Sequence, residues 1–343
     1  TYGYYDRSGE EADFNKAYIM NPLTIPYNED GSLRLLTWED TPYAENPLGS
    51  LNIHNNDITQ RINSVNYLEI TCPIEGLSYK LNTNYSYTSR LDQTYYGRTD
   101  TQEGFANDGK LIVKSSYQKD WLIENILSYN RTFGKHTLFL TALYSAQSHN
   151  EMYYQMTGLG FQSDLNTYWQ PNKANTLTAT ASEATERHVS QMFRANYSYD
   201  SRYLFTATVR RDGYSAFGAD KKYGIFPSVA LGWNIANEPF FKNSSASDAV
   251  NNLKLRLSWG KNGNEGIEAY STLPILTGKN YLDGDHNTAY GYFASTLAAT
   301  DVGWETTEQY NLGIDYGFLK NRISGSLELY YRSTYDLLLY RTI

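Results

Sequence analysis

The sequence is poor in the residues from which large soluble cores and disulfide scaffolds are built. It has one cysteine, Cys72, in 343 residues, which excludes an intramolecular disulfide and a metal site made of several cysteines. Hydrophobic residues are 41% of the chain and the mean hydropathy is -0.58, a thin supply for a large core. Because no apolar run approaches the roughly 18 residues of a transmembrane helix, a helical membrane protein is excluded. A transmembrane β-barrel is not, since only every second residue of its strands faces lipid.

The charge balance and the motif content exclude further classes of protein. Acidic residues outnumber basic ones by 37 to 29, for a formal net charge of -8. A nucleic-acid partner would require clustered lysine and arginine, so we expect none. The five histidines are scattered without an H-E-x-x-H spacing, and neither a G-x-S-x-G elbow nor a P-loop occurs. We therefore predict neither a catalytic metal nor an enzyme.

One acidic stretch is a candidate ion site. The sequence DGDHN at 283–287 resembles the start of a calcium-binding loop, which has glycine at its sixth position and glutamate at its twelfth. Those positions hold Thr288 and Ala294 here. We therefore predict no cofactor, with a looser loop calcium as the weaker alternative.

What the sequence does have is alternation of apolar and polar residues, together with an unusual share of aromatic ones. Aromatic residues are 15% of the chain and include 33 tyrosines, whose rings suit interfaces with one wet side. The alternation recurs in segments of about ten residues, the length of a tilted strand that crosses a bilayer. We predict strands at 61–71, 76–89, 120–132, 136–149, 186–199, 202–212, 225–236, 252–260, 305–317 and 322–332.

Within these segments one face is apolar and the other polar. In NLKLRLS, at 252–258, three leucines alternate with Lys254, Arg256 and a serine. In YNLGIDYGF, at 310–318, the polar side includes Asp315. A soluble β-sandwich would show the same pattern, with its apolar faces covered by a second sheet. Alternation alone therefore leaves both a barrel and a sandwich open.

The lengths of the connections favour the barrel. Short connections at 72–76, 133–135, 200–201 and 319–321 alternate with long polar and aromatic loops at 90–119, 150–185, 213–224 and 261–304, and the longer connection 237–251 falls in a turn position. An up-and-down meander sends every second connection to the same end. Long loops at one rim and tight turns at the other are the plan of an outer-membrane barrel. Sandwiches have no reason to sort their loops in this way.

Four stretches then resemble a known family, in the family's order. The stretch from RANYSYDSRYLF to GIFPSVALGWNIANEPFF, at 194–241, has two strands around a tight turn, the loop RRDGYSAFG and an F-P-S strand that contains a tryptophan. MNPLTIPYNEDGSL (20–33), NLKLRLSWGKNGNEGI (252–267) and the segment beginning WETTEQYNLGIDYGF (304–339) also match. Together they resemble the SusC/RagA-like family of TonB-dependent outer-membrane transporters of Bacteroidota.

The resemblance implies a larger fold than ten strands. Members of the family have an N-terminal plug, a segment that engages TonB and a closed barrel of about twenty-two strands. We therefore expect an all-β chain: a partial antiparallel up-and-down transmembrane β-barrel, about ten of about twenty-two strands, with long extracellular loops and short periplasmic turns. Residues 1–343 would be one internal portion of the barrel, with 1–60 mainly extracellular loop and strand entry, and with the plug domain absent from this sequence.

The resemblance also implies a function and partners. It implies TonB-dependent import of a large nutrient, an oligosaccharide or a peptide, across the outer membrane of a Gram-negative bacterium of the Bacteroidota. The implied partners are a SusD-like surface lipoprotein, the TonB–ExbB–ExbD complex through segments absent here, and outer-membrane lipid; a dimer of SusC–SusD-like pairs is a further assembly of this kind. Three alternatives stay open: a siderophore- or cobalamin-type receptor without a SusD-like lid, a passive porin, and a soluble carbohydrate-binding β-sandwich.

Two sets of residues are candidates for solute contact. Aromatic rings in the predicted loop 150–185 could stack on sugar rings or peptide side chains, or could instead pack within the loops or against the lipoprotein. Polar residues on the side of the strands away from lipid could line the solute path, or could pair with one another or hold the plug. The loop aromatics are Tyr153, Tyr154, Tyr168 and Trp169, and the lumen-facing candidates are Lys80, Arg194, Arg210, Lys254, Arg256, Asp315 and Glu328.

Overall fold

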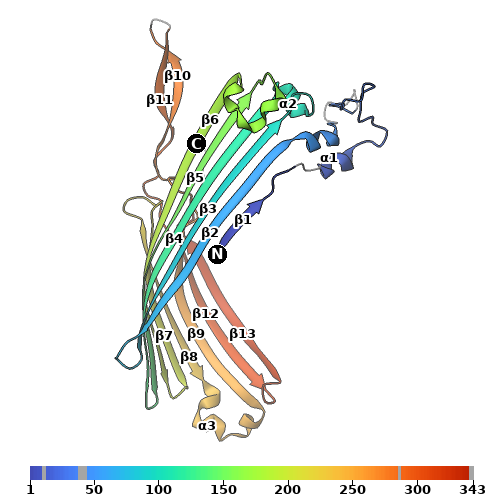
Figure 1. Ribbon diagram of the computed structural model, residues 1–343. Coiled ribbons are helices and arrows are strands. Elements are labelled where there is room, and N and C mark those ends of the chain that lie inside the picture. Colours follow the sequence, from blue (N-terminus) through green and yellow to red (C-terminus); the bar gives the residue numbers. More distant parts are fainter. Residues whose placement is uncertain (10–12, 38–44, 285–286, 340–343) are drawn as a thin grey trace. The chain divides into compact units, whose positions relative to one another are not determined.

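The computed structural model describes residues 1–9, 13–37, 45–284 and 287–339, apart from the side chain of Asn166. In these residues, eleven strands form one sheet in the order of the chain, and two further strands form a separate hairpin (Figure 1). None of the described helices has the length and apolar content needed to cross a bilayer. The sheet consists of β1 (Tyr2–Asp6), β2 (His54–Thr71), β3 (Leu77–Tyr96), β4 (Lys110–Phe133), β5 (His136–Leu159), β6 (Thr176–Tyr199), β7 (Tyr203–Tyr214), β8 (Tyr223–Asn234), β9 (Val250–Asn264), β12 (Glu305–Phe318) and β13 (Ile323–Tyr335). The separate hairpin consists of β10 (Ile275–Leu282) and β11 (Thr288–Thr296).

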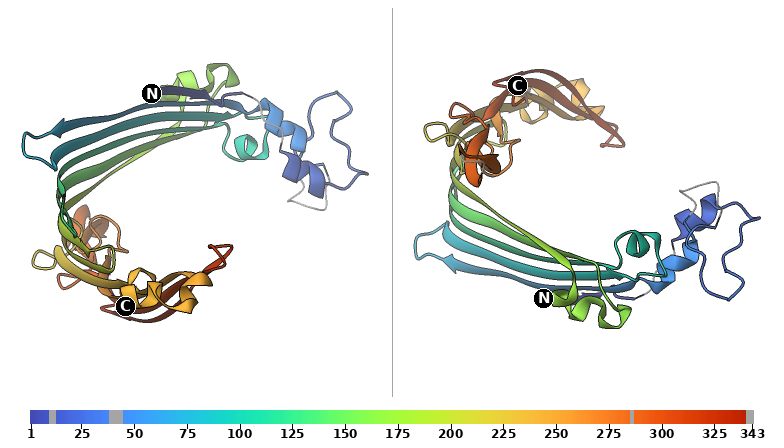
Figure 2. Two further views of the ribbon diagram at one scale, coloured as in Figure 1. Left: turned by 90° about the horizontal axis from the view of Figure 1, so that it is seen from below. Right: turned by 90° about the horizontal axis from the view of Figure 1, so that it is seen from above.

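The helices are short and lie in the connections. α1 and α2 are N-capped by side chains, with Asp13 accepting from the amide of Lys16 and Thr101 from that of Gly104. Figure 2 shows α1, η1 and α2 together at the same end of β2 and β3. The helices are α1 (Phe14–Ile19), α2 (Gln102–Ala106), α3 (Pro239–Lys242), η1 (Pro47–Asn52), η2 (Asp164–Trp169), η3 (Pro171–Lys173), η4 (Ile235–Asn237) and η5 (Ser245–Asp248).

All ten predicted strands are confirmed, but several are much longer than predicted. β4, β5 and β6 each extend over 24 residues, so the predicted loops 90–119 and 150–185 shrink to 97–109 and 160–175. The added end of β6 consists mainly of threonine and alanine, and those of β4 and β5 have apolar residues on both faces, as in LIV at 111–113 and MYY at 152–154. Neither arrangement gives a clear contrast between an apolar and a polar face. Three strands were missed: β1, and the hairpin β10–β11 inside the predicted loop 261–304.

The chain divides into two compact units, each with a small buried core. One unit consists of 1–64, 85–120 and 149–184 and the other of 65–84, 121–148 and 185–343. The first is centred on Tyr95, Leu111 and Phe161. The second is centred on Tyr214, Ala216 and Phe217, packed against Trp304, Val302 and Ile267. Both clusters involve loop residues at strand ends, so they fix the loops and do not form the centre of a globule.

In the second unit the apolar face of the sheet is exposed. The register pairs Leu231 with Leu257, and Leu257 with Leu312. Leu231 is 50% exposed and Leu257 51%, and no second sheet covers them in the part of the chain that the structure describes. A soluble sandwich would bury this face, whereas lipid can cover it in an outer-membrane barrel.

Tight turns join the strands at the predicted positions. Asp200 and Ser201 both have positive φ, at 52° and 54°, and the amide of Arg202 donates to the Tyr199 carbonyl at 2.9 Å. These are the features of a type I′ hairpin turn, whose twist matches that of the flanking strands. The longer connection between β8 and β9 contains η4, α3 and η5, so it is a folded turn.

Candidate functional site

Six of the seven lumen-facing candidates share one face of the sheet in the second unit. Arg194 lies directly opposite Thr208, and its Nε donates to the threonine Oγ1 at 3.1 Å. Since side chains alternate along a strand, Arg210 lies on the same face as Thr208. The register between neighbouring strands from β7 to β13 places four further candidates on the same face: Lys254, Arg256, Asp315 and Glu328.

Three of these residues pair with one another. Arg256 donates to Asp315 through Nε at 2.9 Å and through Nη2 at 2.8 Å, and Nη2 also donates to Glu328 Oε1 at 2.8 Å. Gly232 and Gly313 lie opposite Arg256 on the two neighbouring strands. Gly313 leaves room for the guanidinium to lie across the sheet, since a Cβ there would be 3.0 Å from its central carbon. The cluster therefore joins β9, β12 and β13. Mutual pairing of the polar residues was one of the alternatives that the sequence left open.

The seventh candidate, Lys80, is in β3. Its Nζ lies 5.1 Å from the centre of the Tyr67 ring on β2, within cation–π range. The contact holds the ammonium against a neighbouring strand.

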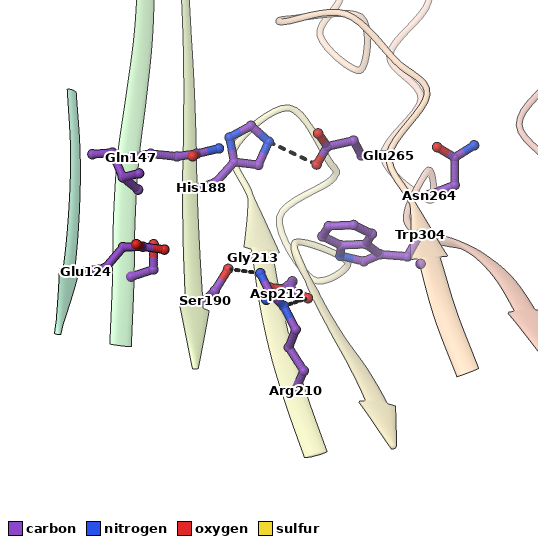
Figure 3. Close-up of a pocket in the computed structure, with 13 residues that line it drawn as sticks. Glu124, Gln147, His188, Ser190, Arg210, Asp212, Gly213, Asn264, Glu265 and Trp304 are labelled. Carbon is purple, nitrogen blue, oxygen red and sulfur yellow. Dashed lines mark hydrogen bonds and ion pairs between the residues drawn. The ribbon is translucent and has the colours of Figure 1, made fainter. Parts of the chain in front are cut away.

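Arg210 belongs to a polar recess of about 440 Å³ on the same face (Figure 3). Its Nε lies 2.8 Å from both carboxylate oxygens of Asp212, and its Nη2 donates to Ser190 Oγ at 3.0 Å. The recess is lined by Leu122, Glu124, Ser145, Gln147, His188, Ser190, Arg210, Asp212, Gly213, Gly263, Asn264, Glu265 and Trp304.

His188 joins the wall of the recess to the long connection that follows β9. Its Nε2 lies 2.9 Å from Glu265 Oε2, and its ring stacks on Tyr214 with centroids 4.5 Å apart and planes 11° apart. The Tyr214 hydroxyl donates to the Ile267 carbonyl at 3.1 Å. The start of the connection that carries β10–β11 is thus attached to β6 and β7.

The recess has an acidic excess. Of its three carboxylates, only Asp212 is paired with a permanent cation, Arg210. Glu124 accepts from the side-chain amide of Asn82 at 3.3 Å, and Glu265 is in contact with a histidine. Carboxylates and amides in a wet recess can accept hydrogen bonds from hydroxyl, amide and ammonium groups. A polyanionic solute would meet repulsion there.

The sequence indicated only Arg210 among these lining residues. Glu124 and His188 lie on β4 and β6, and Glu265 and Trp304 follow β9 and precede β12. Alternation could assign Glu124 and His188 to the polar face. It could not show that strands so far apart in the sequence meet at one recess.

Two of the four predicted loop aromatics are in a strand. Tyr153 and Tyr154 belong to β5, so the prediction that they lie in a loop is wrong. As neighbours in a strand they point to opposite faces and cannot bind one ligand together. Tyr153 donates to Gln155 Oε1 at 2.7 Å, whereas Tyr154 lines an apolar groove with Val113 and Met156.

Tyr168 and Trp169 do lie in the connection between β5 and β6, in η2, but with different surroundings. Tyr168 packs on the cluster of Tyr95, Leu111 and Phe161. Trp169 is 73% exposed, with its ring centre 5.1 Å from that of Tyr168. Of the two, the indole is the ring with a free face.

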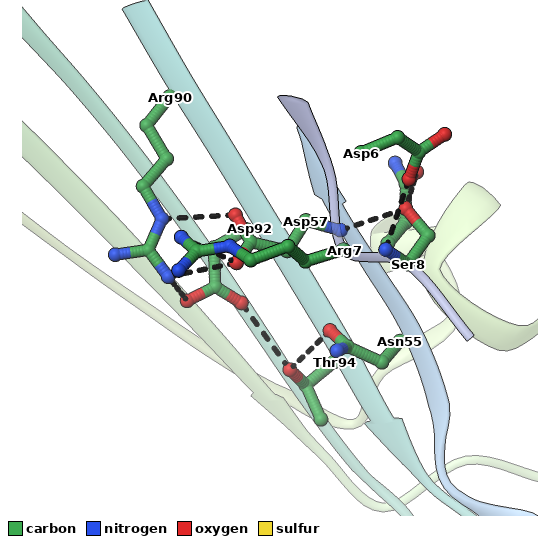
Figure 4. A network of polar contacts seen from close by, with 9 residues as sticks. Asp6, Arg7, Ser8, Asn55, Asp57, Arg90, Asp92 and Thr94 are labelled. Carbon is green, nitrogen blue, oxygen red and sulfur yellow. Dashed lines mark hydrogen bonds and ion pairs between the residues drawn. The ribbon is translucent and has the colours of Figure 1, made fainter. Parts of the chain in front are cut away.

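A second polar network, in the first unit, joins β1, β2 and β3 (Figure 4). Asp57 is buried and accepts from Arg90 at 2.9 and 3.0 Å, and the Arg7 guanidinium lies 3.1 Å from the same carboxylate. Arg90 also lies 3.5 Å from Asp92. Because Asp57 accepts from Arg90 of β3 and pairs with Arg7, which directly follows β1, the network fixes the short strand β1 against its neighbours. In the acidic stretch 283–287, the weaker candidate for a loop calcium, residues 285 and 286 lie outside the described residues.

Comparisons with known proteins agree with the geometry. A family model described as TonB dependent receptor-like, beta-barrel, matches residues 2–343. TonB-dependent receptor P39 of Formosa agariphila is 31% identical over 98% of this chain and 32% of its own length. TonB-dependent receptor SusC of Bacteroides thetaiotaomicron is 38% identical over 55% of this chain and 19% of its own length.

Solved structures show the same fold. The structure of the RagAB peptide transporter superposes with a TM-score of 0.75 and 23% identity, over 92% of this chain and 34% of that chain. The chain spans about a third of the length of P39, 32%. The resemblance drawn from the four motifs is confirmed. The chain belongs to the TonB-dependent receptor β-barrel family of the Gram-negative outer membrane, and it is similar to SusC in sequence and to RagAB in fold.

Proposed function

We propose that the protein imports a large nutrient, an oligosaccharide or a peptide, across the outer membrane with energy delivered through TonB. The observation that carries the proposal is the two-sided sheet of a family member: an exposed apolar face for lipid and a polar face with a recess of about 440 Å³. A recess lined by carboxylates, amides and hydroxyls suits neutral or cationic solutes of either class.

The proposal includes a SusD-like surface lipoprotein as partner. The relatives SusC and RagAB support it, as does the aromatic character of the parts that project from the strands. Tyr281, Tyr290 and Tyr292 of the hairpin are exposed, as is Trp169. Amphipathic rings of this kind are enriched where proteins bind one another.

Uptake in cells tests the active-import proposal. Cells that carry the full-length gene are grown on a single oligosaccharide or peptide mixture, with and without a functional tonB gene. Growth and uptake should be lost without TonB. Uptake that persists would indicate a passive porin, and uptake restricted to iron chelates or cobalamin would indicate a receptor of that type.

Deleting the neighbouring lipoprotein gene tests the partner separately, because it should lower uptake without lowering the amount of barrel in the membrane.

The recess is tested by a neutralising pair. Glu265→Gln and Glu124→Gln keep the shape of the side chains and remove charge. We expect each to weaken uptake of a cationic solute severalfold, with uptake of a neutral one less affected. Glu75→Gln, in the turn between β2 and β3, removes the same charge outside the recess and is the matched control. Equal effects of all three variants would contradict a role of the recess in solute contact.

A further inference from the structure

We propose that the outer part of β6, Thr176–Ala184, is a docking edge for an extended segment of a protein partner, which adds to the sheet as one more strand. β6 is 24 residues long, but β7 is 12 residues long and pairs with it only over 188–199. In the described residues no other strand neighbours β6 on that side. The inference goes beyond the import function and does not depend on the solute.

The direction of the backbone groups follows from the hydrogen bonds at the ends of β6. The amide of Asp200, just after the strand, donates to the Lys135 carbonyl on the β5 side at 2.7 Å. The backbone of Arg187 faces the other way: its amide donates to Ser215 Oγ at 2.9 Å and its carbonyl accepts from the Ser215 amide at 3.0 Å. Since backbone groups alternate between the two sides of a strand, the amides and carbonyls that point away from β5 belong to Leu177, Ala179, Ala181 and Glu183.

This edge lies outside the bilayer. A strand of about 9–11 residues suffices to cross the hydrocarbon core, and the paired portion of β6 with β7 already has that length. An open edge is excluded within lipid but allowed in water. The residues from Thr176 to Glu183 are all exposed, as an accessible edge requires.

The edge lacks the residues that usually prevent a second strand from pairing with it. Soluble edges are usually blunted by lysine, proline or a bulge, because unpaired strands recruit other strands. From Thr176 to Ser182 the chain reads TLTATAS, which contains no charged residue and no proline. Alanine and threonine leave the backbone accessible to a second strand.

A groove beside the edge indicates what kind of segment fits. Ala179 and Ala181, whose backbones face outward, line an apolar groove of about 250 Å³ with Tyr154 and Met156. A strand added at an edge gains affinity from its main chain and specificity from pockets for alternate side chains. At the inner end of the edge Glu183 supplies a negative charge, which favours a basic residue in the partner.

The lining of the groove is mostly apolar, whereas the lining of the solute recess is mostly polar. An apolar groove beside an open strand edge suits the alternate side chains of an added strand. We therefore assign the edge to a resident protein partner with alternating apolar residues and a basic end.

The test uses the full-length receptor in detergent and a fluorescein-labelled synthetic peptide of alternating valine and threonine that ends in lysine. Wild-type protein should raise the anisotropy of the peptide saturably. Ala181→Pro removes an outward amide that the β5 ladder does not use, so it should fold and bind at least tenfold more weakly. Ala181→Val keeps the amide and is the matched control, and a peptide ending in glutamate should bind more weakly than the lysine peptide.

Amide hydrogen exchange of the wild-type receptor tests the same edge without a substitution, and so does not depend on whether Ala181→Pro folds. The amides of Leu177, Ala179 and Ala181 should exchange fast in the receptor alone and slowly with the peptide. Protection without peptide would show that another part of the chain or a second copy covers the edge, and would overturn the proposal. Equal peptide binding by Ala181→Pro and Ala181→Val, or no saturable binding to wild type, would overturn it as well.

Discussion

The guanidinium of Arg256 occupies the space that a side chain at Gly313 would need. The two residues lie directly opposite each other on β9 and β12, and a Cβ at Gly313 would be 2.9 Å from Arg256 Nη2. This placement lets one arginine reach Asp315 on the same strand as the glycine and Glu328 on the next. A residue without a side chain thus makes a three-strand ionic cluster fit on the polar face.

Gly313→Val should therefore break the cluster. The isopropyl group would displace Arg256 and separate its charge-assisted hydrogen bonds to Asp315 and Glu328. We expect a lower temperature for loss of the heat-modifiable form on a denaturing gel. Gly317→Val, four residues along β12 and away from Arg256, is the comparison, and an equal loss there would mean that the strand merely rejects valine.

Tyr168→Ala and Trp169→Ala should have unequal effects on the stability of the loop 160–175. The first removes a ring that packs on Tyr95 and Phe161 and should destabilise the loop by about 1–3 kcal/mol. The second removes an exposed ring and should change stability by less than about 0.5 kcal/mol. Limited proteolysis of the loop measures both. Faster cleavage in Trp169→Ala than in Tyr168→Ala would contradict the packing described for them.

Gly218→Ala should release the connection that carries the hairpin β10–β11. A Cβ at Gly218 would lie 1.8 Å from the Thr300 carbonyl oxygen, and the Gly218 amide donates to the Val302 carbonyl at 3.1 Å. Backbone cannot yield as a flexible side chain can, so the contact should open. We expect faster amide exchange in 265–274 and 297–304 with the strands unchanged. Gly284→Ala, where a Cβ meets no atom within 4 Å, is the control.

The turn that contains Glu238 should lose protection in acid. Hydrogen bonds from Tyr203 and then from Trp233 and Arg202 lower the pKa of the Glu238 carboxyl from its ordinary value of 4.5. A lowered pKa means that the folded state favours the carboxylate, so the contribution is complete above pH 4.5 and disappears as the pH falls through the lower folded value. Amide exchange of 235–243 measured across this acid range should show the loss.

Glu238→Gln provides the control for that titration. The variant cannot ionise, so the protection of 235–243 should be lower at neutral pH and should not fall further in acid. A wild-type profile that is flat through the acid range, or a variant that titrates like wild type, would contradict the role given to this carboxylate. The buried position of Glu238 and its 2.8 Å bond from Arg202 make a measurable effect expected.

The membrane-crossing parts of the strands could be predicted from the sequence, because one face of the sheet meets lipid there and the other meets water. Leu253, Leu255 and Leu257 alternate with Lys254 and Arg256, and this pattern survives without knowledge of the partner strands. The outer halves of β5 and β6 could not be found in this way. In TLTATAS the residues that alternate with threonine are one leucine and two alanines, so the two faces differ too little in polarity to mark a strand.

The fold class, the order of the strands and the family follow from local patterns in the chain: alternation, turn residues and four motifs in a fixed order. Which residues meet depends on the tertiary structure. Arg210 came from the pattern, whereas its neighbours in the recess, His188 and Glu265, come from distant parts of the chain. Register brings such side chains together, and register depends on every turn between them, which no local pattern contains.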